Sequence, residues 1–203
     1  MPRRQFALVL VLLGVAVGAL AWAMNHFVGD RSPTATVESS GTPLVVSDFE
    51  LVDQNGRVVR DEDLRGRPQL VFFGFTTCPD ICPTTLTKIT TVLVDLGTDA
   101  DKLTPILVTV DPERDTPAVL KEYLTAFDPR IVGLTGTPEQ VESALKSFRL
   151  YAGKRELDGG EYTMDHSTFI YLMDGNGDYA RHFSASSEVD ELVKSIRDEI
   201  AAG

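Results

Sequence analysis

The chain has 203 residues, of which 43% are hydrophobic and 24% are charged, enough apolar sequence for one packed domain of ordinary size. Its formal net charge of -11 argues against a nucleic-acid-binding protein, which needs clustered Lys and Arg. Cys78 and Cys82 are the only cysteines, so the fold cannot depend on a disulfide scaffold.

Residues 1–29 predict a membrane anchor. Two arginines precede an uncharged run, Phe6–Met24, that is about long enough to span a bilayer. The positive-inside rule then places the N-terminus in the cytoplasm and the rest of the chain outside it. A cleaved signal peptide is the alternative, because small residues within 19–23 also suit a cleavage site. The length of the run and Trp22 near its end favour the anchor.

Residues 30–43 are rich in Ser, Thr, Pro and Gly and predict a flexible linker to a body at 44–203. The body opens with a β-hairpin, 49–59, turned at Asn55-Gly56. Apolar runs typical of buried strands then alternate with capped amphipathic runs typical of helices. The predicted strands are 70–73, 105–110, 131–134, 168–173 and 178–183, and the predicted helices are 84–96, 116–127, 137–148 and 187–200. This alternation, closed by a second hairpin, predicts a three-layer α/β domain with a mixed central sheet.

Cys78 and Cys82 lie in the sequence Cys-Pro-Asp-Ile-Cys-Pro, where a buried strand gives way to a helix. Positions i and i+4 share one face of a helix, so the two sulfurs can bind a soft metal ion or cycle between dithiol and disulfide. The helix N-terminus is expected to favour the thiolate in either case. A purely structural disulfide is the plainer interpretation, but a bridge across so short a loop would stabilise the fold little.

His166 lies in a loop just before the strand predicted at 168–173. Of the other two histidines, His26 falls in the N-terminal segment, and we expect His182 on the surface of the last hairpin. A lone loop histidine is more often structural than a ligand, but an exported cysteine pair makes His166 a candidate ligand. Two thiolates and one imidazole suit copper, because thiolates favour Cu(I) and imidazole accommodates Cu(II). Structural zinc needs four protein ligands, and no fourth Cys or His is available, since His26 and His182 are expected elsewhere.

A third segment, Asp-Pro-Glu-Arg-Asp-Thr-Pro at 111–117, follows the strand predicted at 105–110. Sites in open α/β sheets gather at the carboxyl ends of the strands. Asp111 is therefore a candidate to orient a ligand, or to face a metal pocket without binding the metal. The alternative is a solvated charge network that caps the helix at 116–127, and the sequence leaves both interpretations open.

The cysteine spacing favours metal binding over thiol exchange. Redox pairs are typically CxxC, and thioredoxins place a proline before a late strand, whereas no proline follows Pro138 here. A thiol–disulfide reductase is the main alternative, and it would need Cys78 and Cys82 but not His166. A peroxiredoxin-like peroxidase would need one strongly activated cysteine, and Pro79 directly after Cys78 argues against it.

Three motifs in this order resemble those of the Sco/SenC family: Cys-Pro-Asp-Ile-Cys-Pro at 78–83, Asp-Pro-Glu-Arg-Asp-Thr-Pro at 111–117 and Asp-His-Ser at 165–167. The resemblance covers roughly residues 44–200. It implies a thioredoxin-like domain with an added N-terminal β-hairpin, preceded by one transmembrane helix. It also implies copper, as Cu(I) or Cu(II), on three ligands, namely Cys78, Cys82 and His166.

The same resemblance implies a metallochaperone rather than an enzyme, one that delivers copper to the copper A site of cytochrome c oxidase during assembly. Its partners would be the copper A subunit of the oxidase, a periplasmic copper donor or thiol reductant, and the membrane, but not nucleic acid. A bacterial inner membrane, crossed once with the domain on the extracytoplasmic side, is the expected location. The alternative function is a reductase that keeps the copper-ligand cysteines of the oxidase reduced.

Overall fold

The computed structural model describes Trp22 and residues 49–203. Apart from Trp22, the anchor predicted at 1–29 and the linker predicted at 30–43 lie outside the described residues, so both stay predictions. Within the described part of the chain, we find no helix with the length and hydrophobicity that a membrane span requires.

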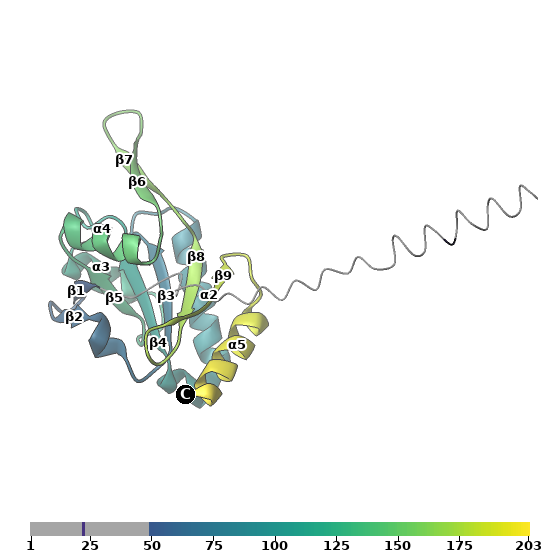
Figure 1. The fold of residues 1–203 in the computed structure, drawn as a ribbon. Helices are drawn as coiled ribbons and strands as arrows, with labels where there is room; N and C mark the ends of the chain where they lie inside the picture. The colour runs from purple at the N-terminus through teal and green to yellow at the C-terminus, as the bar shows by residue number, and fades with distance from the viewer. Residues whose placement is uncertain (1–21, 23–48) are drawn as a thin grey trace, which may run out of the picture. The chain divides into compact units, whose positions relative to one another are not determined.

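A mixed sheet of seven strands forms the centre of the domain (Figure 1). The strands are β1 (Glu50–Asp53), β2 (Val58–Arg60), β3 (Gln69–Gly74), β4 (Thr104–Thr109), β5 (Val132–Thr135), β8 (Phe169–Met173) and β9 (Tyr179–Ser184). Their order is β2-β1-β5-β4-β3-β8-β9. β3, β4 and β5 run parallel, and β8 returns antiparallel to β3. The predicted mixed sheet and both predicted hairpins, β1–β2 and β8–β9, are therefore confirmed.

Local sequence explains why these strands form where they do. Every residue of β3 is buried, as expected of an apolar central strand that is covered on both faces. The β1–β2 turn is closed by Asp53, whose carboxylate accepts from the backbone N–H groups of Asn55 and Arg57. Gly56 follows with a φ of 83°, a conformation that glycine adopts readily.

Four α-helices complete the domain: α2 (Ile81–Leu96), α3 (Pro117–Leu124), α4 (Pro138–Ser147) and α5 (Val189–Ala202). The predicted caps are confirmed, because Thr116 accepts from the backbone of Val119 and Thr137 accepts from that of Gln140. Two 3₁₀ turns, η1 (Asp61–Leu64) and η2 (Gly97–Lys102), were not predicted. α2 begins three residues earlier than predicted, which places the second cysteine on the helix itself.

The helices cover the sheet on both faces and make the predicted three layers. α2 and α5 pack against each other, and the loop after α3 contacts α2 through Thr90, which accepts from the backbone N–H of Asp128. α4 lies on the opposite face, where Phe148 packs edge-on against Phe73 at 5.0 Å and against Tyr171 at 5.5 Å. The core between these layers is apolar and continuous.

A second, two-stranded sheet projects from the body (Figure 1). It pairs β6 (Ala152–Glu156) with β7 (Tyr162–His166), and we call it the β6–β7 ribbon. The prediction that His166 lies in a loop is wrong, because His166 is the last residue of β7. The ribbon escaped prediction because β6 is polar and mostly exposed, so it lacks the apolar alternation that indicates a strand.

Candidate metal centre

The two cysteines lie where β3 passes into α2. Cys78 is in the connecting turn and 9% exposed, and Cys82 is the second residue of α2 and fully buried. Both are free thiols. The backbone N–H of Cys82 donates to Sγ of Cys78 over 3.4 Å, so the first turn of the helix binds the earlier sulfur.

The Cys82 sulfur fits against β3 because residue 74 is glycine. A Cβ at Gly74 would lie 3.1 Å from Sγ of Cys82 and 2.9 Å from Cε1 of Phe72. Both distances are shorter than ordinary van der Waals contact, so any side chain at this position would displace the sulfur or the ring. Sequence reasoning did not identify Gly74; its place at the end of a buried strand, just before the cysteine motif, was the available signal.

The fold brings His166 to the cysteines from 84 residues further along the chain. Its Nε2 atom lies 3.6 Å from Sγ of Cys82, and its Nδ1 atom lies 2.9 Å from the carbonyl oxygen of Ser167. Because a carbonyl oxygen only accepts, Nδ1 donates and the lone pair of Nε2 is left facing the sulfur. Phe75 packs edge-on against the imidazole at 5.7 Å, which restricts the rotation of the ring.

Cys78, Cys82 and His166 lie close together but do not form a complete metal site. Cys78 and His166 both line a pocket of about 420 Å³ that opens to solvent between α2 and the ribbon. Metal–sulfur and metal–nitrogen bonds of about 2.3 and 2.0 Å, the lengths found for zinc, can join two atoms separated as Cys82 Sγ and His166 Nε2 are. Among the described residues, no three Cys, His, Asp or Glu side chains already converge as a complete ligand set. The Cys78 sulfur accepts from the helix N-terminus instead, so it would have to turn to complete a three-ligand set with Cys82 and His166.

Burial shifts the pKa values of Cys82 and His166 in opposite directions. It raises the pKa of the Cys82 thiol well above its usual range, and the hydrogen bond with Cys78 raises this pKa further. Burial also lowers the pKa of His166. The expectation that the helix N-terminus favours a thiolate is therefore wrong for Cys82, where loss of hydration has the larger effect. A metal ion bound by the Cys82 sulfur would have to displace the proton of this thiol.

Asp111 is buried at the carboxyl end of β4, but it lies against the ribbon rather than against the cysteines. Its carboxylate pairs with Arg114 and accepts from the phenol of Tyr162 over 3.0 Å. Its backbone N–H donates to Oγ1 of Thr109 over 2.9 Å. These contacts join the β4–α3 loop to β7, the strand that ends at His166.

Asp115 is a buried residue near the centre that sequence reasoning missed. Its carboxylate accepts from the backbone N–H of Thr76 at 3.0 Å, from the hydroxyl of Thr76 at 2.6 Å and from the hydroxyl of Thr109 at 2.6 Å. Thr76 is two residues before Cys78, so Asp115 ties the cysteine turn to the end of β4. The available signal was its place in the acidic run that ends at the cap of α3.

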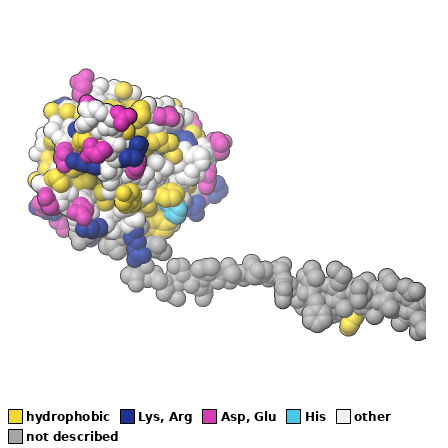
Figure 2. All heavy atoms as spheres, turned by 90° about the horizontal axis from the view of Figure 1, so that it is seen from above, with side chains coloured by type: hydrophobic (Ala, Val, Ile, Leu, Met, Phe, Trp, Pro, Cys, Tyr) yellow, Lys and Arg dark blue, Asp and Glu magenta, His cyan; other side chains and the backbone are white. Residues whose placement is uncertain are grey.

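The surface around the centre carries charges of both signs. Seen from the end of the domain that bears the ribbon, acidic, basic and hydrophobic side chains alternate over the surface (Figure 2). Arg155 and Asp165 both line the pocket of the centre and pair with each other over 3.0 Å. They lie on the ribbon beside His166, so a partner that reaches this histidine would also meet their charges.

Comparison with known proteins agrees with this architecture. The model of the SCO1/SenC family matches residues 37–201. The SCO2-like protein of Rickettsia conorii is 36% identical over 195 residues, which cover 95% of each chain. The mitochondrial SCO2 homolog of Bos taurus is 40% identical over 205 residues, which cover 98% of this chain and 76% of the bovine one.

Solved structures of related proteins share the fold. The copper-bound ScoI of Bradyrhizobium japonicum is 45% identical with a TM-score of 0.72, over 76% of this chain and 99% of that one. The copper-bound ScoI of Arabidopsis thaliana is 34% identical with a TM-score of 0.73, over 78% and 99% of the two chains. BsSco, described as having a disulfide switch and as a member of the Sco family of cytochrome c oxidase assembly proteins, is 25% identical with a TM-score of 0.63, over 80% and 98%. The thioredoxin-like α/β fold is thus shared with these structures, and the chain belongs to the SCO1/SenC family.

Proposed function

We propose that this protein is a copper metallochaperone that binds copper through Cys78, Cys82 and His166. The observation that carries the proposal is the 3.6 Å separation between Sγ of Cys82 and Nε2 of His166, residues that lie 84 positions apart in sequence. The copper-bound ScoI structures of relatives support the choice of metal. As cargo, copper would be delivered to the copper A site of cytochrome c oxidase during assembly of the oxidase.

The donor set suits transfer rather than permanent storage. Two thiolates favour Cu(I), and the imidazole accommodates Cu(II). Cys78 and His166 line an open pocket, so a partner can approach two of the three ligands from solvent. The copper A subunit would be the recipient, and a periplasmic copper donor or thiol reductant would load or reduce the centre.

The proposed location is a bacterial inner membrane, with the domain on its extracytoplasmic side. Two arginines followed by the uncharged run Phe6–Met24 support this placement. Protease digestion of intact spheroplasts tests it, because the domain should be degraded while cytoplasmic markers survive. A domain that survives in intact spheroplasts would contradict the proposed orientation.

Titration with Cu(II) tests the ligand set. The structure provides a matched pair of variants, because His182 is exposed on β9 and bonds to Tyr179 rather than to the centre. We expect His166→Ala to bind Cu(II) more weakly by a factor of roughly 10 or more, since one of three ligands is lost, and His182→Ala to bind like the unmodified protein. Equal Cu(II) binding by all three proteins would exclude the three-ligand site.

A thiol–disulfide reductase, which would need Cys78 and Cys82 but not His166, is the second candidate function. Both cysteines are free, and the backbone N–H of Cys82 donates to Sγ of Cys78 over 3.4 Å, so the two residues of the pair are in direct contact. The disulfide switch described for BsSco supports such a cycle. Restoration of oxidase activity by His166→Ala, with failure of both cysteine variants, would favour the reductase over the chaperone.

A further inference from the structure

The position of His166 depends on a part of the fold that the main sheet does not hold. The β6–β7 ribbon is a separate two-stranded sheet with no ladder of hydrogen bonds to the seven-stranded one. Along β7, Tyr162, Met164 and His166 alternate with Thr163 and Asp165, so the first three share one face of the ribbon. Contacts made by Tyr162 at the start of β7 therefore influence the position of the His166 imidazole at the end of the same strand.

Tyr162 is held by a group of residues that we call the tyrosine clasp. The guanidinium of Arg114 lies 3.8 Å from the centre of the Tyr162 ring, and the ammonium of Lys154 lies 4.7 Å from it, both within cation–π range. The phenol donates to Asp111 over 3.0 Å, and Arg114 donates to the carbonyl oxygen of Tyr162, also over 3.0 Å. Asp111 pairs in turn with Arg114, and Glu113 pairs with Lys154 at 2.6 Å.

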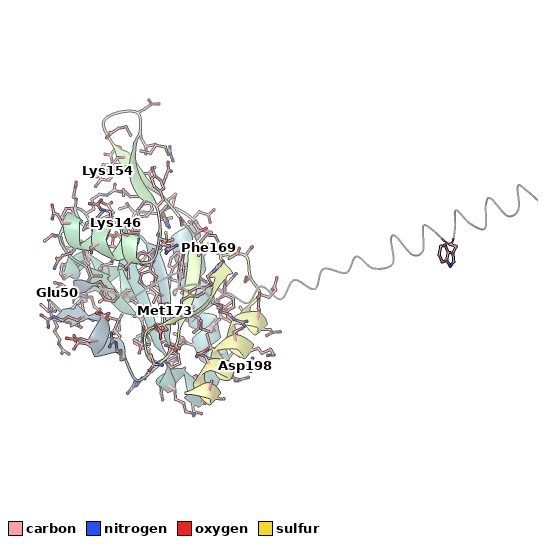
Figure 3. All side chains as sticks on the ribbon, in the orientation of Figure 1. Glu50, Lys146, Lys154, Phe169, Met173 and Asp198 are labelled. Atoms are coloured by element: carbon pink, nitrogen blue, oxygen red, sulfur yellow. The ribbon has the colours of Figure 1, made fainter. Side chains whose placement is uncertain are left out.

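The clasp joins the ribbon to the rigid body of the domain. Lys154 and Tyr162 belong to the two strands of the ribbon, and Lys154 lies on the ribbon in Figure 3. Asp111 and Arg114 belong to the loop that follows β4, and the Asp111 side chain is 1% exposed. Because Asp111 is fixed in the core, a bond to its carboxylate fixes the ribbon relative to the sheet. Met164 lies on β7 between the clasp and His166 and packs against the core, so it provides a further contact between the ribbon and the body of the domain.

We propose that Tyr162 and Arg114 are positioning residues for His166, because the clasp holds β7 at the angle that keeps the imidazole facing Cys82. The proposal rests on the proposed function, in which His166 is a copper ligand. It also gives a role to the Asp-Pro-Glu-Arg run, which touches none of the three ligands in the contacts described above. The competing explanation is that the clasp stabilises the domain as a whole and has no particular effect on His166.

Copper titrations of the full-length protein in detergent separate these explanations. Tyr162→Leu removes the ring and the phenol, and Tyr151→Leu is the matched control, because Tyr151 is 69% exposed and directly precedes the ribbon. We expect Tyr162→Leu to weaken Cu(II) binding by about 10–100-fold, the usual effect of losing a residue that orients a metal ligand. Cu(I) binding should fall less, because two thiolates suit Cu(I). Tyr151→Leu should bind both ions like the unmodified protein.

The double variant shows whether Tyr162 acts through His166. If it does, Tyr162→Leu causes no further loss of Cu(II) affinity in a protein that already carries His166→Ala. Tyr162→Phe keeps the ring over Arg114 but loses the bond to Asp111, so it should recover part of the affinity. It also keeps the test decisive if Tyr162→Leu fails to fold by circular dichroism.

Each remaining outcome contradicts one claim. Unchanged Cu(II) binding by folded Tyr162→Leu, or by Tyr162→Phe where the leucine variant is unfolded, would overturn the clasp as a positioning device. An additional loss in the double variant would overturn it too, since Tyr162 would then act independently of His166. If His166→Ala alone leaves Cu(II) binding unchanged, the proposed ligand set fails instead.

Discussion

Replacing Asp115 with alanine is expected to destabilise the domain strongly, because it removes the acceptor of a buried hydrogen-bond network. The Asp115 carboxylate is fully buried and accepts three hydrogen bonds, two from Thr76 and one from Thr109. A buried donor left without an acceptor costs roughly 1–3 kcal/mol. Three such donors predict that Asp115→Ala lowers the free energy of unfolding by about 3 kcal/mol or more. Urea denaturation of the reduced protein measures this loss.

Asp115→Asn is the matched control, because it keeps the shape and can keep three hydrogen bonds if the hydroxyl of Thr76 becomes an acceptor. It also removes the cost of a buried charge. Burial raises the pKa of Asp115 above its ordinary value of 3.8. The Asp115 carboxyl group therefore binds a proton more tightly in the folded state than in the unfolded state. The unmodified protein should therefore lose stability relative to Asp115→Asn as pH rises from about 4 through the raised pKa. A loss below about 1 kcal/mol in Asp115→Ala, or the opposite pH trend, would refute this account of the network.

Three further substitutions test the packing around the centre. Gly74→Ala would place a Cβ 3.1 Å from the Cys82 sulfur, so we expect the affinity for Cu(I) to fall by a factor of roughly 10. Competition with a chelator measures this affinity, and an unchanged value would show that the sulfur can move freely. Phe148→Ala removes a buried ring that packs against Phe73 and Tyr171, and it should lower the free energy of unfolding in urea by about 3–5 kcal/mol. A loss under about 1 kcal/mol would mean that α4 does not pack as described. Thr137→Ala removes the cap of α4 and should cost about 1 kcal/mol, with Thr137→Ser as the control that keeps the hydroxyl.

The sequence was sufficient to predict the elements that bury an apolar face. Residues 70–73 of β3 form an unbroken apolar run, so its position as a central strand followed directly. Thr116 and Thr137, each followed by proline, marked the starts of α3 and α4 correctly. α3 ends at Leu124 rather than at 127, because helix ends depend on tertiary contacts that the pattern does not contain.

The ribbon and the charges of the centre were beyond sequence reasoning for two physical reasons. β6 reads Ala-Gly-Lys-Arg-Glu and is held by pairing and by the clasp, not by burial of an apolar face. Asp158-Gly159-Gly160, typical of a hairpin turn, was its only local signal. The raised pKa of Cys82 could not be predicted either, since it depends on how deeply the first turn of α2 is buried.

X-ray absorption spectroscopy of the copper-loaded protein tests the central claim most directly, because it counts sulfur and nitrogen neighbours without reference to delivery. The proposed ligand set predicts one copper per chain bound by two sulfurs and one imidazole nitrogen, with the imidazole signal absent in His166→Ala and retained in His182→Ala. A spectrum with the same imidazole signal in His166→Ala would contradict a centre built from Cys78, Cys82 and His166.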